Sequence, residues 1–438
     1  MTKPQPSQVK LVRAIGRWSL VALTVNSILG SGIFGLPAVI AAVLGHLSPW
    51  AVLLAGGAMG VIVSCYGEVA SQFAETGGTY LYIRHAFGRF AGLQVGWMSL
   101  LSRFTACAAA VNLLVLYVGE FWPAATQPIP RFAIITLFLG TLGLVNYRGV
   151  GVGAWVSNVS VVAKLLALGL VCAVGAGYLI THPAVQVAPV LADQDGWLRA
   201  ILLLFFAYGG YEAALNPMGE AKDPRRDAAF ALLVSLLIVT LLYTLLQFIV
   251  VGVLPDPGHS DRPLADAARV FMGSRGAALI TTGALISVYG YLSANLLTGP
   301  RAMFALAELG DFPAQFAAVH PRMRTPHVAI TVFAVLIWVF ALVGSFSWNV
   351  TLSAVARLAY YGAVCAAVPV LRGRQPGAAT FRVPGGPTLP ILGVVICALL
   401  LTRVDFTKSL ILAATIAIAC LNWLAVRNRS PLRPEPLP

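Results

Sequence analysis

A glycine-rich stretch interrupts the first long apolar run of this sequence. The run covers about 14–42, and the motif GSGIFG occupies 30–35. A transmembrane helix needs about 20 apolar residues, so the run is long enough to cross a bilayer. Each glycine weakens a helix by about 1 kcal/mol relative to alanine, and a broken helix persists in hydrocarbon only where protein or a water-filled cavity surrounds the break. The stretch predicts two half-helices with an unwound joint near mid-membrane or, alternatively, a close-packed glycine interface between intact helices.

An unwound joint would create a binding position for a carboxylate. The free N–H groups of Gly30, Ser31 and Gly32 would open the second half-helix, whose positive dipole end attracts anions. Ser27 lies one helical turn before Ser31, and its hydroxyl has two alternative roles. It either faces a cavity beside the joint or hydrogen-bonds to the backbone of its own helix, as serine often does in membrane helices.

A second interrupted apolar run lies about half a chain further on. The sequence FFAYGGYE at 205–212 again contains glycines, roughly 180 residues after the first break. Paired glycine-interrupted segments in corresponding positions are the best sequence indication of a secondary transporter's binding site. The backbone carbonyls of Phe206, Ala207 and Gly209 are predicted to accept a substrate ammonium. The rings of Phe206 and Tyr208 either cover that site or pack against other helices.

Four segments of the chain resemble the amino acid–polyamine–organocation (APC) permeases. They are GSGIFGLP at 30–37, AETGGTYLYIRHAFG at 74–88, FFAYGGYEAALNPMGEAKDPRR at 205–226 and GPRAMFALAELGDFP at 299–313. The resemblance extends from the first to the eighth expected helix and so covers most of the chain. It implies two inverted repeats of five helices, 14–181 and 197–371, with the first and sixth helices broken, followed by two accessory helices within 388–426.

The composition independently indicates an all-α polytopic membrane protein. The chain is 58% hydrophobic and only 10% charged, with a mean hydropathy of +0.83, whereas a typical soluble domain is about 25% charged. The apolar runs predict about twelve spans, at 14–39, 48–73, 91–118, 131–147, 155–181, 197–220, 227–253, 276–306, 327–346, 350–371, 388–403 and 408–426. The first run is too long for a cleaved signal peptide and is expected to act as a signal anchor.

The net charge of +13 follows the membrane topology and gives no indication of nucleic acid binding. With the N-terminus inside, the inner loops and tails hold nineteen of the 29 lysines and arginines and the outer loops hold seven. This bias matches the positive-inside rule. It predicts a multi-pass protein of the inner (plasma) membrane whose tails, 1–13 and 427–438, are both cytoplasmic. The sequence carries no signal for an oligomeric state.

Three cations, Arg103, Lys164 and Arg357, fall inside predicted spans, where a charge needs a partner or water. Arg103 is predicted to form a structural or gating ion pair, with direct contact to an acidic substrate group as the alternative. Glu212 and Glu68 are its candidate partners. Arg357 lies in the tenth helix together with Tyr360 and Tyr361. In the fold that the resemblance implies, this helix acts as an outer gate.

Lys164 and Glu212 are the candidates for coupling transport to ions. Lys164 lies about nine residues inside the fifth predicted helix, roughly 14 Å deep, which is too far for easy snorkelling. In sodium-independent APC permeases a lysine of this helix stands where sodium-coupled relatives bind an ion, so the resemblance assigns that role to Lys164. The alternative is a structural lysine bonded to carbonyls at the first break. Glu212 is the acidic group nearest the inferred site and therefore a proton-coupling candidate.

These observations predict a sodium-independent secondary transporter of amino acids that works by alternating access. The carboxylate would meet the backbone at Ser31–Ile33, and a neutral side chain is the first expectation. A cationic amino acid or a polyamine is the alternative, and proton symport and exchange both remain open. A nutrient sensor that binds without transport belongs to a different class. No catalytic nucleophile, metal set, cofactor or nucleotide loop is visible, so an enzyme is not expected.

Overall fold

The computed structural model describes residues 15–73, 77–149, 154–185 and 193–429. Within them the chain is helical, and the described part contains one isolated bridge, between Ile15 and Ala221, and no extended strand. The α-helices are α1 (Arg17–Ile28), α2 (Gly32–Leu44), α3 (Ser48–Ala70), α4 (Gly78–Phe87), α5 (Arg89–Val118), α6 (Pro128–Tyr147), α7 (Ala154–Thr181), α8 (Gln194–Tyr208), α9 (Pro224–Val253), α10 (Pro263–Glu308), α11 (His327–Val343), α12 (Phe346–Arg374), α13 (Thr388–Leu401) and α14 (Phe406–Val426). The 3₁₀ segments are η1 (Gly45–Leu47), η2 (Pro123–Thr126), η3 (Tyr211–Glu220), η4 (Pro257–His259) and η5 (Ala314–Ala317).

The expected polytopic architecture is confirmed. Nine apolar segments of the described chain are long enough to cross a membrane, and one of them, Gly32–Ala70, comprises both α2 and α3. When α2 and α3 are counted as belonging to two spans, these segments make ten. The shorter apolar helices α11 and α13 then bring the candidate spans to the predicted twelve. The eighth span begins earlier than the expected 276, because α10 starts at Pro263 and bends at Gly273, where φ is 67°.

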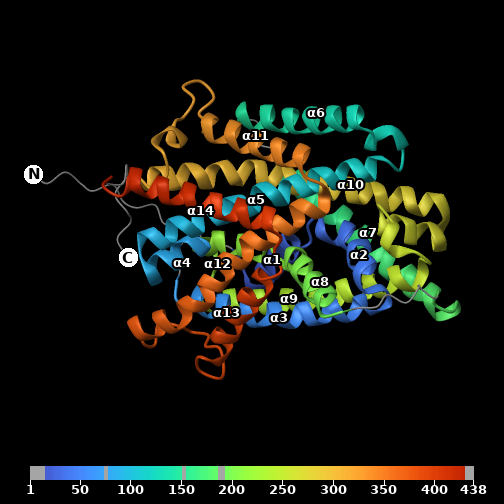
Figure 1. Cartoon of the computed structure of the whole chain (residues 1–438), viewed down its shortest axis with the longest axis horizontal. Coiled ribbons are helices and arrows are strands. Elements are labelled where there is room, and N and C mark those ends of the chain that lie inside the picture. Colours follow the sequence, from blue (N-terminus) through green and yellow to red (C-terminus); the bar gives the residue numbers. More distant parts are fainter. Residues whose placement is uncertain (1–14, 74–76, 150–153, 186–192, 430–438) are drawn as a thin grey trace, which may run out of the picture.

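Helix burial separates an inner group from a lipid-facing group. The most apolar stretch of α5 is 83% buried, whereas that of α6 is only 17% buried and that of α14 22%. The half-helices α1, α2 and α8 lie in the middle of the molecule, and α6 and α11 lie together along one edge (Figure 1). The broken helices are therefore enclosed by protein, which is the condition for unwound backbone at membrane depth.

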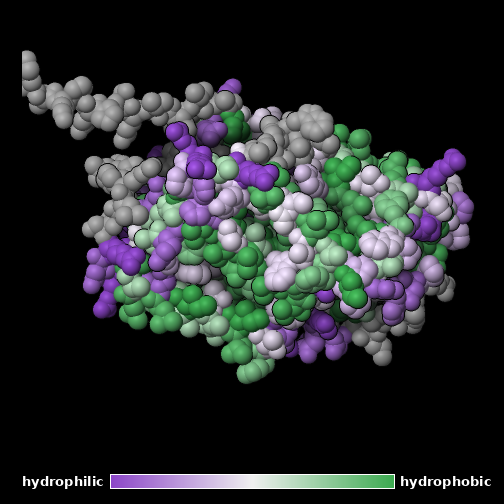
Figure 2. Space-filling model, turned by 90° about the horizontal axis from the view of Figure 1, so that it is seen from above, coloured by the Kyte–Doolittle hydropathy of each residue, from purple (hydrophilic) through white to green (hydrophobic). Residues whose placement is uncertain are grey.

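The surface has the pattern of a membrane protein. Hydrophobic side chains cover much of the middle of the face shown in Figure 2, and hydrophilic ones gather toward its left and right ends. Exposed leucines on the outer helices include Leu137 on α6, Leu241 on α9 and Leu421 on α14. An apolar belt between polar ends is what a bilayer requires of the side chains that face its lipid.

Ion pairs tie the helices together on the face where α1 begins and α14 ends, here called the terminal face. Arg372 donates from Nε and Nη2 to the two oxygens of Glu68 at 2.6 and 2.7 Å, and the Val383 N–H adds a third bond to this carboxylate. Asp311 accepts from Arg89 at 2.5 Å and from Arg84 at 3.3 Å. Both carboxylates are fully buried, so each pair resists separation of the helices that it joins.

Candidate substrate site

The first break has the predicted form. The helix α1 ends at Ile28 and α2 begins at Gly32, and Leu29 between them leaves helical geometry with ψ 72°. No side chain caps the start of α2, and Ser31 Oγ is buried without a hydrogen-bond partner among the described residues. Gly32 is also closely packed, because a Cβ there would lie 3.1 Å from the Cα of Ala207, but the helix is broken and not intact as the glycine-packing alternative supposed.

The second break is also present, but the chain does not resume as an α-helix. After α8 ends, Gly209 is extended at φ −77° and ψ 166°, and Gly210 has φ 107°. This left-handed geometry favours glycine, and a Cβ at Gly210 would in addition lie 2.5 Å from the Ser27 carbonyl oxygen. The following segment is the 3₁₀ helix η3.

The two breaks enclose a small cavity. Its volume is about 30 Å³, and its walls are Ser27, Ile28, Gly30, Ser31, Gly32, Phe206, Ala207, Gly209, Gly210, Tyr291 and Arg357. Seven of the nine residues predicted to bind substrate are in this set, and Ile33 and Tyr208 are not. Ligand pockets usually measure about 300–1,000 Å³, so the cavity has room for water but must widen to admit an amino acid.

Tyr208 faces away from the cavity. Its hydroxyl donates to the Val52 carbonyl on α3 at 2.9 Å, and its ring packs against that of Tyr243 with centroids 5.5 Å apart. Ile33 contributes instead to a separate small void beside Tyr243. The idea that Tyr208 covers the site is therefore not supported, whereas Phe206 does form part of the wall.

Lys164 lies where the sequence places it, at the carbonyls of the first break. Its Nζ donates to Leu29 O at 2.8 Å and to Asn26 O at 2.9 Å, and the residue is 6% exposed. These oxygens lack helical partners because α1 ends at Ile28. Ser27 satisfies both earlier alternatives, since Oγ donates to Leu23 O at 2.8 Å while the residue lines the cavity.

Glu212 is surrounded by donors from α12. Its Oε1 accepts from the Tyr360 hydroxyl at 2.9 Å, and Oε2 accepts from Tyr361 at 3.2 Å and from the Gly210 N–H at 2.9 Å. The Nη1 of Arg357 lies 3.8 Å from Oε1. The carboxylate is thus held by three hydrogen bonds, with one cation nearby.

Among the described residues, Arg103 forms no ion pair with either of its candidate partners, Glu212 and Glu68. Glu212 lies with Arg357, and Glu68 is bound by Arg372, because α12 brings both of these arginines to the carboxylates. Arg103 itself is half-buried on α5. Its neighbour Ser102 accepts a hydrogen bond from Arg357 Nε at 3.0 Å, so Arg357 of α12 is anchored to α5.

Arg357 and Tyr291 are site residues that the sequence prediction left out. Both line the cavity, Arg357 from α12 and Tyr291 from α10. A signal existed for each, since Arg357 is one of three cations inside a span and Tyr291 belongs to a polar stripe, 287–295, on its helix. The sequence alone did not show which face of α10 or α12 meets the second break.

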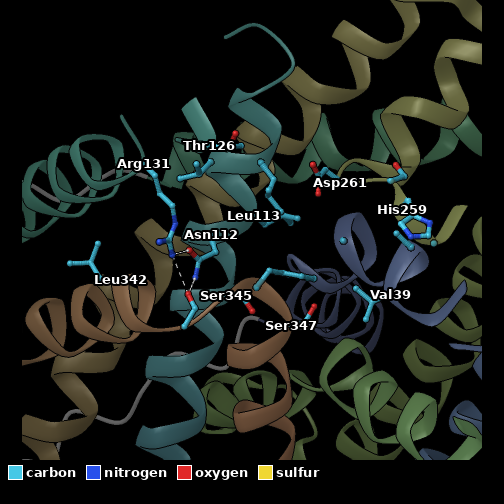
Figure 3. A pocket seen from close by; sticks show the side chains of 18 of the residues that line it. Val39, Asn112, Leu113, Thr126, Arg131, His259, Asp261, Leu342, Ser345 and Ser347 are labelled. Atoms are coloured by element: carbon cyan, nitrogen blue, oxygen red, sulfur yellow. Dashed lines mark hydrogen bonds between the residues drawn. The ribbon is translucent and has the colours of Figure 1, made fainter. Parts of the chain in front are cut away.

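A larger hollow of about 740 Å³ opens on the face opposite the terminal face (Figure 3). Arg131 of α6 and Asn112 of α5 point toward each other on its wall, and Arg131 Nη2 donates to Asn112 Oδ1 at 2.9 Å and to Gly344 O at 3.2 Å. His259 lies at its edge, where a hydrogen bond with Asp256 raises the pKa of the imidazole above its usual value. We call this hollow the vestibule.

A thin barrier separates the vestibule from the cavity. The vestibule reaches Gly35, about one helical turn beyond Gly32 on α2. A Cβ at Gly35 would lie 2.5 Å from Cζ of Phe346 and 2.9 Å from Cδ1 of Leu113. These two side chains therefore pack directly on the helix at the floor of the vestibule.

Aromatic rings and an ion pair lie on the side of the terminal face. Tyr66, Tyr211 and Tyr361 form an aromatic cluster with ring centroids 5.1–5.6 Å apart. The bound pair of Glu68 and Arg372 comes two residues further along α3. The cavity is therefore separated from both faces by packed side chains.

Two enclosed broken helices around a central cavity define a polytopic carrier of small molecules. The chain belongs to the amino acid permease family, whose model matches residues 15–424. It is 28% identical to the serine/threonine exchanger SteT of Bacillus subtilis, over 88% of this chain and 89% of that protein. It is also 28% identical to the branched-chain amino acid permease BcaP of the same organism (90% and 89%) and 27% identical to the vacuolar cationic amino acid transporter 4 of Arabidopsis thaliana (83% and 64%).

Proposed function

We propose that this permease is a sodium-independent secondary transporter of amino acids that works by alternating access in the plasma membrane. The observation that carries the proposal is the cavity at the meeting point of two broken helices, with a lysine ammonium on the freed carbonyls of the first break. In this assignment the two five-helix repeats, 14–181 and 197–371, move against each other around that cavity.

The backbone supplies complementary charges for an amino acid. The uncapped start of α2 at Ser31–Ile33 is the positive end of a helix dipole and suits the α-carboxylate. The carbonyls of Phe206, Ala207 and Gly209 suit the ammonium. Two of these already have donors within the chain, since Gly209 N–H bonds Phe206 O at 3.2 Å and Tyr243 Oη lies 3.2 Å from Ala207 O. Because a carbonyl oxygen has two lone pairs, each can accept a second bond.

Sodium independence follows from Lys164. Its ammonium already binds Asn26 O and Leu29 O, the kind of oxygen ligands that a sodium ion would use at an unwound helix. These two hydrogen bonds hold the first break in one arrangement. Proton symport and substrate exchange are both compatible with this geometry, and Glu212 is the acidic group that would carry a coupled proton.

The side chain of the substrate is constrained by Arg357. The sequence favoured a neutral amino acid first and a cation second, and two relatives are named for serine, threonine or branched-chain amino acids. A guanidinium in the cavity wall repels a second cation, which counts against cationic amino acids and polyamines. The two-sided arrangement of barriers supports transport over a sensor that only binds.

Uptake into proteoliposomes tests the proposal. The purified protein is assayed with a panel of labelled amino acids, in sodium and in choline buffers, with and without a pH gradient and internal substrate. We expect uptake of at least one amino acid that is equal in the two buffers. Strict sodium dependence, or binding without uptake under every condition, would contradict the proposed function.

The orientation has its own test. The loop charge bias places both termini in the cytoplasm, and Pro6 in the N-terminal tail, which lies outside the described residues, is a suitable position for a single cysteine. We expect an impermeant thiol reagent to modify this cysteine only after the cells are opened. Labelling in intact cells would reverse the topology.

A further inference from the structure

The guanidinium of Arg357 has an unused donor beside the cavity. The residue is 7% exposed, and its Nη1 has no hydrogen-bond partner among the described residues. Its Nε is fixed by Ser102 Oγ at 3.0 Å, and its Cζ lies 5.7 Å from the centre of the Phe206 ring. A buried donor without an acceptor is costly, so Nη1 marks a position where a ligand acceptor would be stabilised.

Glu212 does not fill this position. The 3.8 Å between Arg357 Nη1 and Glu212 Oε1 exceeds hydrogen-bond length. The carboxylate instead accepts from Tyr360, Tyr361 and the Gly210 N–H. The pair therefore balances charge without using the fork geometry in which a guanidinium binds a carboxylate most strongly.

The buried charges around the cavity are positive in sum. Among the described residues, Arg357 lies in the cavity wall and the Lys164 ammonium binds the carbonyls of the first break. The carboxylate beside Arg357 is Glu212. Two cations against one anion leave an excess of one positive charge, and charges at membrane depth require partners. An anionic ligand group would reduce this excess, whereas a cation would increase it.

Gly209 gives the cavity direct access to Arg357. A Cβ at this position would lie 1.3 Å from Nη1, so the guanidinium occupies the space where any other residue would place its side chain. The glycine of the second break thus brings the arginine up to the backbone at which the substrate ammonium is expected. The uncapped start of α2 lies on the other wall of the same cavity.

We propose that the substrate is an amino acid with an acidic side chain, and that its second carboxylate binds Arg357. The inference rests on the proposed function. It replaces the neutral side chain that the sequence favoured with an acidic one. The α-carboxylate takes the start of α2 and the ammonium takes the carbonyls of the second break, which leaves the side-chain carboxylate for Nη1. Arg357 then acts as the residue that determines specificity.

A panel of isosteric pairs tests the class of substrate. Initial uptake of labelled aspartate, asparagine, glutamate, glutamine and lysine is measured in proteoliposomes of the wild-type protein. We expect kcat/KM for at least one acid to exceed that of its amide at least tenfold, with lysine below both. Uptake of amides or lysine as good as that of the acids would overturn this inference and leave the proposed function intact. Failure of all five would also overturn this inference, whereas only failure of the wider amino acid panel described for the proposed function would remove that function itself.

Variants of the arginine test the role of its side chain. Arg357→Gln is expected to lower the ratio of kcat/KM for the acid to kcat/KM for its amide at least tenfold. Arg357→Lys should restore part of this ratio, because it returns the positive charge without the two-pronged guanidinium geometry. Arg403→Gln is the matched control, since Arg403 pairs with Asp195 at the surface and should leave the ratio unchanged. An unchanged ratio in Arg357→Gln would overturn the assignment. If size exclusion shows that this variant does not fold, the wild-type panel and Arg357→Lys decide.

Discussion

The two broken helices differ in how their free backbone groups are satisfied. At the first break the carbonyls of Asn26 and Leu29 bind a lysine from another helix, while the start of α2 has no side-chain cap. At the second break the Gly210 N–H is bound by Glu212 of the same segment. The first break therefore presents an open positive helix end, and the second one is closed by its own carboxylate.

This difference gives the two breaks different tasks. An uncapped α-helix start attracts an anion through its N–H groups and dipole, whereas the 3₁₀ segment η3 begins with an anion already in place. In the cavity wall the second break is accompanied by the charged Arg357, which lies beside Glu212, whereas the first break contributes Ile28 and small residues. We infer that the first break binds the constant part of the substrate and the second one discriminates among side chains.

The largest expected effect is that of Gly32→Leu at the first break. The Cβ alone would approach Ala207 Cα to 3.1 Å, so a leucine would push the half-helices apart and cover the N–H groups of α2. We expect loss of substrate binding in purified protein, with normal membrane insertion because the span stays apolar. Gly57→Leu is the control, since nothing lies within 4 Å of a Cβ there. Unchanged affinity in Gly32→Leu would show that the first break only packs helices.

The second break is tested by Gly209→Ala, compared with Gly30→Ala at the first. A methyl group at 209 would overlap the Arg357 guanidinium at 1.3 Å, whereas one at 30 would lie 3.7 Å from Tyr291, an ordinary contact. We expect uptake to fall roughly a hundredfold in Gly209→Ala, about 2.7 kcal/mol, and to stay within about threefold of wild type in Gly30→Ala. Equal losses in the two variants would argue against the different tasks of the two breaks.

Lys164→Ala tests what keeps the first break in shape. Removal of the ammonium leaves Asn26 O and Leu29 O without their donor, so the binding arrangement of the break should be less populated. We expect initial uptake to fall at least tenfold, about 1.4 kcal/mol, with surface expression largely kept. Uptake is measured in sodium and in choline buffers for both proteins. A variant with normal rate and normal pH dependence would make Lys164 only a tolerated structural lysine.

The sequence predicted the breaks because their cause is local. Glycines inside an apolar run weaken the helix wherever the run is placed, and a deeply buried lysine must find carbonyl oxygens. Helical geometry explains one error at the second break. Phe206 and Tyr208 are two residues apart on α8, so their side chains point about 200° apart and cannot both face one cavity. The model has Phe206 in the wall and Tyr208 bonded to Val52.

The contribution of Arg357 could not be predicted in the same way. Arg103 and Arg357 both stand out as cations inside spans, and choosing between them as the partner of Glu212 depends on which helix packs beside the second break. That packing joins residues about 150 positions apart in sequence, and no local pattern encodes it. The terminal-face pair of Glu68 with Arg372 likewise joins residues 304 positions apart, and it was not predicted from the sequence.

The smallest expected effect concerns Tyr243, which joins the two breaks. Its hydroxyl oxygen lies 3.2 Å from both Ile28 O and Ala207 O, so one O–H is shared between the last carbonyl of α1 and a carbonyl near the end of α8. Tyr243→Phe keeps the ring and removes this link. A hydrogen bond contributes about 0.5–1.5 kcal/mol net, so we expect substrate affinity to weaken about two- to tenfold.

Tyr208→Phe is the matched control for this comparison. It also removes a hydroxyl that donates to a carbonyl, Val52 O at 2.9 Å, but that carbonyl belongs to the intact helix α3. We therefore expect Tyr208→Phe to lower thermal stability by a similar amount while leaving affinity unchanged. Affinity is measured by equilibrium binding to the purified variants, and stability by thermal unfolding of the same samples. If the two variants lose affinity equally, the hydroxyls act only on general stability. A selective loss in Tyr243→Phe would indicate that the breaks work as one site because α9 holds them at a fixed separation.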